Sequence, residues 1–136
     1  MGGGIRCTDS SPVIANNTIT LNKAAWGQGI YCERSDAVIT NNLIMGNFQP
    51  GGSGDAGGGI FSMSGSPTIL YNRIIGNHAP SGGGIALYKS NARIAYNLDP
   101  RQSGNDRRRG YRLLGLRSDH LQQPDYRECP PRNKRS

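Results

Sequence analysis

Isoleucine recurs along the first 98 residues in columns that keep one spacing. Within a unit the isoleucines are nine, five and then eleven residues apart, and the units repeat after 25, 30 and 25 residues. The first column is Ile5, Ile30, Ile60 and Ile85; the second is Ile14, Ile39, Ile69 and Ile94; the third is Ile19, Ile44 and Ile74. Because all three separations are odd, these side chains share one interior only if the chain bends between them.

Polar positions keep the same period. Glycine precedes the first isoleucine of each unit as GGGI or GQGI, and the five additional residues of the second unit fall in the loop-like stretch between Asn47 and Gly57. The asparagine columns are Asn17, Asn42, Asn72 and Asn97, then Asn22, Asn47 and Asn77. This repetition predicts a solenoid.

Each unit is therefore expected to form one coil of three short strands and three bends. Stacked coils place equivalent strands in parallel about 4.8 Å apart, with isoleucine on isoleucine and asparagine on asparagine. Asparagine tolerates the left-handed conformation of a bend, and its amide can bond to the amide of the next coil. The fold class is all-β, a solenoid of about four coils, because no helical apolar period persists.

The units GGGIRCTDSSPVIANNTITLN, GQGIYCERSDAVITNNLIMGN, GGGIFSMSGSPTILYNRIIGN and GGGIALYKSNARIAYN resemble the repeats of the right-handed parallel β-helix family, the pectin-lyase-like superfold. The resemblance covers about residues 2–97 and supplies the handedness. It also implies a secreted or cell-surface protein and a polysaccharide partner, although a shared fold does not fix an activity.

Composition changes abruptly near Leu98. Residues 1–98 hold twelve isoleucines and two valines, with six Lys or Arg against four Asp or Glu, whereas residues 99–136 hold no Ile or Val and ten basic against five acidic residues. We therefore divide the chain into β-helix repeats at 1–98 and a basic, poorly ordered tail at 99–136. The tail is a genuine segment, a capping segment or a frameshift product.

We favour the frameshift. One permitted codon set for residues 99–120, read one base later, gives IPGNRATTGGGVIASSASDPIT, which restores the missing repeat. Met1 also abuts the first GGGI, and solenoid ends need polar caps. We accordingly expect a fragment of a longer protein, with coil ends prone to self-association.

Two cysteines share one inward position, with Ser62 and Leu87 as their equivalents. Cys7 and Cys32 are in range for a disulfide, but their parallel side chains would strain it. We expect buried free thiols and no metal site, since no third ligand accompanies them. Cys129 falls in the tail.

Outward positions on the strand after GGGI carry the candidate ligand site. Stacking is expected to bring aromatic side chains together on one exposed face, where they could hold sugar rings. The candidate residues are Trp26, Tyr31, Phe61, Tyr88 and Glu33. The alternative is packing beneath a loop such as 46–56.

Catalytic chemistry is poorly represented. Before the tail the carboxylates are Asp9, Glu33, Asp36 and Asp55, and they do not form the close pair that glycoside hydrolysis needs. Asp9 is expected to pair with Arg34 at the surface. We favour a non-catalytic scaffold or polysaccharide-interacting protein; the alternative is a fragment of a polysaccharide lyase or glycoside hydrolase whose catalytic coils are missing.

The remaining classes are excluded on composition. The longest apolar run is too short for a membrane helix, and no signal peptide is visible. The arginine run at 107–109 lacks interleaved aromatic residues, so we expect no specific nucleic-acid partner. The glycines are followed by no GKS or GKT, and we expect no cofactor.

Overall fold

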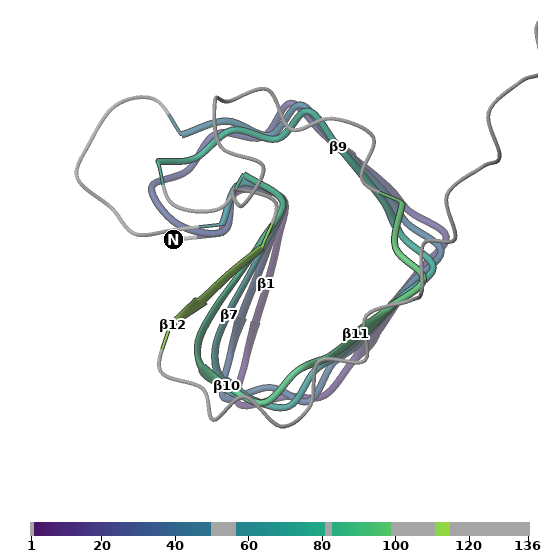
Figure 1. Ribbon diagram of the computed structural model, residues 1–136, viewed down its shortest axis with the longest axis vertical. Helices are drawn as coiled ribbons and strands as arrows, with labels where there is room; N and C mark the ends of the chain where they lie inside the picture. The colour runs from purple at the N-terminus through teal and green to yellow at the C-terminus, as the bar shows by residue number, and fades with distance from the viewer. Residues whose placement is uncertain (1, 50–56, 81–82, 99–110, 115–136) are drawn as a thin grey trace, which may run out of the picture.

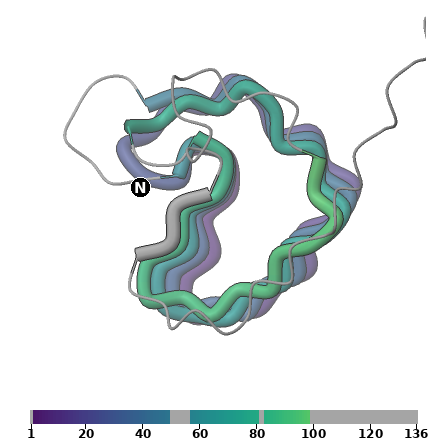
Figure 2. Tube along the Cα trace, in the orientation of Figure 1, coloured from purple at the N-terminus to yellow at the C-terminus, as the bar shows by residue number. Residues whose placement is uncertain are grey.

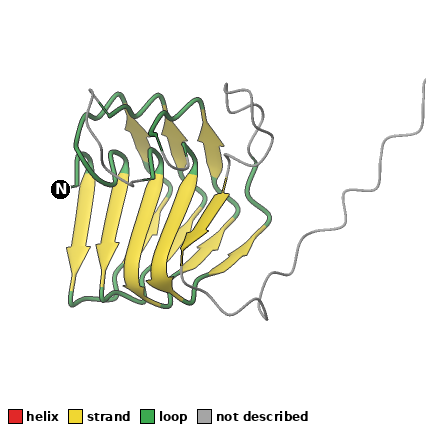
Figure 3. Ribbon diagram, turned by 60° about the vertical axis from the view of Figure 1, so that its left-hand side comes forward, coloured by secondary structure: helices red, strands yellow, loops and turns green. Residues whose placement is uncertain are grey.

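Residues 1–98 wind into a right-handed parallel β-helix, as the repeat and the resemblance predicted. The computed structural model describes residues 2–49, 57–80 and 83–98, and the backbone of 111–114. Viewed down the axis, successive coils superimpose (Figures 1 and 2), and from the side their strands lie in parallel rows (Figure 3).

Three parallel sheets form the walls. The first contains β1 (Ile5–Thr8), β4 (Ile30–Glu33), β7 (Ile60–Gly65), β10 (Ile85–Ser90) and β12 (Tyr111–Leu114). The second contains β2 (Val13–Ala15), β5 (Val38–Thr40), β8 (Thr68–Leu70) and β11 (Arg93–Ala95). The third contains β3 (Thr18–Thr20), β6 (Leu43–Met45) and β9 (Arg73–Ile75). We call β1–β3 the first coil, β4–β6 the second, β7–β9 the third, and β10 with β11 the fourth.

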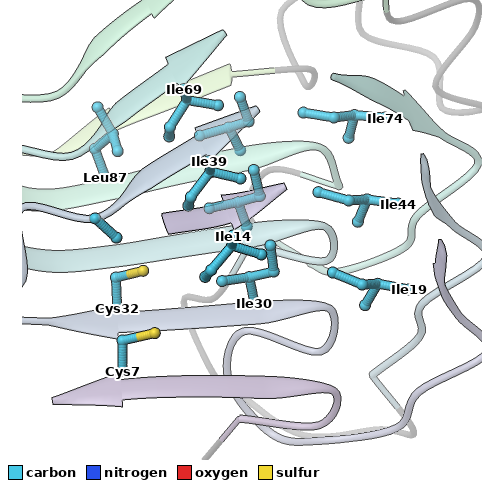
Figure 4. Packing of buried hydrophobic residues seen from close by; sticks show 13 residues of the cluster. Cys7, Ile14, Ile19, Ile30, Cys32, Ile39, Ile44, Ile69, Ile74 and Leu87 are labelled. Atoms are coloured by element: carbon cyan, nitrogen blue, oxygen red, sulfur yellow. The ribbon is translucent and has the colours of Figure 1, made fainter. Parts of the chain in front are cut away.

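The isoleucine columns form the core. Ile5 pairs with Ile30, Ile14 with Ile39 and Ile19 with Ile44, in register, and the interior isoleucines of the second and third coils are at most 1% exposed. Figure 4 shows the side chains of Ile19, Ile44 and Ile74 stacked in one column and those of Ile14, Ile39 and Ile69 in another. The odd spacing thus places every column inside, because a turn intervenes between each pair of strands.

Asparagine ladders join the coils, as predicted. The Asn72 amide Nδ2 donates to Asn97 Oδ1 at 2.9 Å and to the Ile39 carbonyl at 2.9 Å, while its Oδ1 accepts from the backbone N and the Nδ2 of Asn42. Asn22, Asn47 and Asn77 form the second ladder. Each ladder residue therefore satisfies backbone groups that a turn would otherwise leave unpaired.

The left-handed conformation belongs to the residue before each ladder asparagine, not to the ladder residue as the sequence had suggested. At the second turn the residues with positive φ are Asn16, Asn41, Tyr71 and Tyr96; at the third they are Leu21, Gly46 and Gly76. The reversal is made one residue early, so that the following asparagine can turn its amide inward to the neighbouring coil.

The predicted tail is only partly within the described residues. Tyr111–Leu114 form β12, which continues the first sheet by pairing with β10, Tyr111 opposite Ile85. The rest of 99–136, with Cys129 and Arg107–Arg109, lies outside the described residues, as does Asp55.

Candidate functional site

The predicted aromatic strip is largely covered. Tyr31 is fully buried and Phe61 is 2% exposed, and the two rings are 5.7 Å apart. Trp26 meets Phe61 edge-on at 6.0 Å, and Trp26 and Met63 pack against this cluster. The expectation that Tyr31 and Phe61 would be exposed is therefore wrong.

The covering segment is the turn that precedes each first-sheet strand. Gly27 adopts a φ of +55°, and a Cβ placed on it would lie 2.7 Å from the Cβ of Tyr31. The turn thus presses against the outer side of the strand, on the face that alternation alone would leave in solvent. The alternative stated from sequence, packing beneath a loop, describes Tyr31 and Phe61.

Tyr88 is separate from this cluster and 36% exposed. Its neighbour on the chain, Lys89, places its ammonium nitrogen 5.3 Å from the ring centroid of Tyr88. This distance is within the range of a cation–π contact, which at an exposed position contributes about 0.5–1 kcal/mol.

Glu33 sits in an ionic network at the end of β4. Its carboxylate is 16% exposed, accepts from Arg34 Nη1 at 2.6 Å and from the Tyr31 hydroxyl at 3.3 Å, and lies 3.8 Å from Arg6 Nη2. Burial, followed by the charge of Glu33, raises the pKa of Tyr31. The carboxylate is thus held between cations, not directed at an open cleft.

Arg34 also joins the first two coils. Its Nε and Nη2 donate to the two carboxylate oxygens of Asp9 at 2.6 and 2.7 Å, confirming the predicted surface pair. The hydrogen bond from Arg34 holds the pKa of Asp9 below its usual value, and Asp9 in turn raises the pKa of Arg34. Both groups are exposed, so the pair contributes little to stability.

The other described carboxylate has a structural role as well. Asp36 Oδ1 accepts a hydrogen bond from the backbone N of Ser66 at 2.7 Å, which links the second and third coils. Among the described residues, no group of three or more His, Cys, Asp or Glu side chains is gathered where it could hold a metal ion. Every carboxylate that the structure describes therefore holds neighbouring coils together or pairs within one.

Cys7 and Cys32 are free and buried, as predicted, and face each other in register across β1 and β4. Figure 4 shows both side chains directed into the core. Burial raises the pKa of Cys7, and burial together with Cys7 raises the pKa of Cys32 to about 12. These thiols are packing groups with little thiolate character near neutral pH.

Two exposed stacked pairs were missed from the sequence. Tyr71 and Tyr96 are 55% and 59% exposed, with ring centroids 5.1 Å apart and planes 7° from parallel. Phe48 stacks on His78 at 5.6 Å. The signal was present, since Tyr71 and Tyr96 occupy equivalent positions 25 residues apart, each directly before a ladder asparagine.

The comparisons with known proteins identify the family. Within the described ranges, no helix is long and apolar enough to cross a membrane. No curated protein and no solved structure matches the chain. The family model described as "Right handed beta helix region" matches residues 1–98, the span over which the isoleucine and asparagine columns repeat. The chain therefore belongs to the right-handed β-helix family.

Proposed function

We propose that this chain is a non-catalytic scaffold of a secreted or cell-surface β-helix protein, and that its partner is a polysaccharide. The observation that carries the proposal is the use of its charged groups. Asp9, Glu33 and Asp36 are each engaged by a guanidinium or a backbone N–H within 2.6–2.7 Å.

This arrangement disfavours the alternative of a lyase or glycoside hydrolase within the described coils. A retaining or inverting hydrolase needs two carboxyl groups facing each other across the sugar, one of them protonated. Here Arg34 contacts both Asp9 and Glu33 and stabilises their charged forms. Carboxylates held in this way strengthen the stack of coils.

The experiment is an activity panel on the purified chain. Soluble polysaccharides, both neutral and uronate-containing, are incubated with the protein, and released reducing ends and unsaturated products are measured. We expect neither. Product formation that Arg34→Gln abolishes, while the far-ultraviolet circular dichroism spectrum is unchanged, would show that the network is catalytic and overturn the proposal.

The proposed location has its own test. Antibodies against the chain should label intact cells of the source organism as strongly as permeabilised ones. Labelling that requires permeabilisation would contradict a surface location, and the absence of the protein from the culture medium would then also exclude secretion.

A further inference from the structure

The strongest unassigned feature is the exposed tyrosine pair at the second turn. Tyr71 lies between β8 and β9, and Tyr96 follows β11 in the next coil. More than half of each side chain is exposed, and the two rings are stacked nearly parallel. A stacked pair of rings on a β-helix wall is a rigid apolar surface in water.

The backbone under these rings is unfavourable for tyrosine. Tyr71 and Tyr96 have φ values of 56° and 54°, a left-handed conformation that bulky residues rarely adopt. The first two coils place asparagine, which tolerates it, at the equivalent positions, Asn16 and Asn41. Strained conformations of this kind concentrate at ligand sites, and a broken local preference without structural gain marks a functional position.

The geometry leaves one face of Tyr71 available. The hydrogen bond between the Asn42 and Asn72 amides makes Asn41 the neighbour of Tyr71 in the second coil, just as Tyr96 is its neighbour in the fourth. One face of the Tyr71 ring is covered by Tyr96 at 5.1 Å. The other face is directed along the axis toward Asn41, a shorter and exposed side chain.

We propose that Tyr71, backed by Tyr96 and bordered by Asn41, binds a pyranose ring of a polysaccharide. The C–H face of the sugar would lie on the open face of the Tyr71 ring, and its hydroxyl groups would exchange hydrogen bonds with the Asn41 amide, which both donates and accepts. The inference rests on the polysaccharide partner of the proposed function and assigns that partner a contact surface on the second turn.

Affinity gel electrophoresis tests the site. The purified chain is run through gels containing hydroxyethylcellulose, xylan or dextran. We expect at least one of these to retard the protein and Tyr71→Asn to weaken that binding about tenfold. Tyr88→Asn, which removes an exposed tyrosine outside the stack, is the matched control and should bind as the unmodified chain does.

The folded state is checked alongside, because Tyr71→Asn introduces the residue that the second coil already uses. Its thermal midpoint should not fall. Asn41→Ala should also weaken binding, which a purely structural role of the tyrosines would not produce.

The outcomes separate the two proposals. If no polysaccharide retards the unmodified chain, both this site and the polysaccharide partner are wrong. If the unmodified chain is retarded and Tyr71→Asn is retarded equally, only this site is wrong. A concentration-dependent dimer, seen by sedimentation velocity and abolished by Tyr71→Asn, would make the surface a contact between copies and overturn the inference.

Discussion

The glycine that precedes each first-sheet strand offers the sharpest test of the fold. A Cβ added to Gly59 would lie 2.6 Å from the carbonyl oxygen of Gly84 and 2.9 Å from Cγ2 of Ile74. The equivalent Gly4 would meet the Gly29 carbonyl at 2.7 Å. By contrast, a Cβ on Gly76 would meet nothing within 4 Å, although its φ is +58°.

These distances set the magnitudes. Relief of the Gly59 clash to 3.0 Å requires backbone movement of at least 0.4 Å, against a strand whose Gly84 carbonyl also accepts from Ile60 N at 2.8 Å. Overpacking of this kind costs about 1–3 kcal/mol and a weakened hydrogen bond about 1 kcal/mol more, so Gly59→Ala should lower the free energy of unfolding by about 3 kcal/mol. Gly76→Ala incurs only the left-handed penalty of about 1 kcal/mol.

Urea unfolding followed by far-ultraviolet circular dichroism measures both variants. Gly4→Ala provides the intermediate point, because the first coil has the edge strand β1 on one side and can move more freely. We expect the loss of stability to increase from Gly76→Ala through Gly4→Ala to Gly59→Ala. If Gly59→Ala costs no more than Gly76→Ala, the close approach of the coils is not what requires glycine here, and the reasoning is refuted.

Three further predictions use the same measurement. Asn72→Ala should cost about 3 kcal/mol because it leaves buried backbone groups unpaired, whereas the exposed Asn17→Ala should cost about 1 kcal/mol; equal losses would contradict the ladder argument. Leu21→Asn should raise stability by up to about 1 kcal/mol, since Leu21 has a φ of 58° and is 77% exposed, and a lower urea midpoint would show that no strain is relieved. Because burial raises the pKa of Cys32 from 9.0 to about 12, its contribution is complete below pH 9 and is lost as the pH rises toward 12. Cys32→Ser should flatten that part of the decline, and an identical pH profile would refute the assignment.

The core was predictable from the sequence because its constraints are local and repeated. An isoleucine can face inward only at one phase of each strand, and a slip of one residue would expose the whole column. Once Ile5 stacks on Ile30, the register of every later column follows from the 25-residue spacing. The asparagine ladders follow for the same reason, since Asn42 and Asn72 meet wherever the coils are in register.

The turn conformations were less predictable. Asparagine occurs at both positions of the second turn in the first two coils, Asn16–Asn17 and Asn41–Asn42, so residue type alone cannot say which of the two is left-handed. The third and fourth coils resolve the ambiguity in the opposite direction to propensity, because there tyrosine takes the left-handed position. The need to direct the second asparagine inward outweighs the local preference of the first residue.

The outer face of the first sheet shows where alternation stops being informative. Alternation marks Tyr31 and Phe61 as outward, and they are outward, but the neighbouring turns determine whether outward means exposed. Those turns differ in length between coils, as the five additional residues after Asn47 show, and their path depends on contacts such as that between Gly27 and Tyr31. The second turn is short in every described coil, so nothing in those coils folds over it, and a side chain that points outward there reaches solvent. A rigid wall with short turns on one side is therefore where this fold can display a binding residue, and Tyr71 and Tyr96 occupy that place.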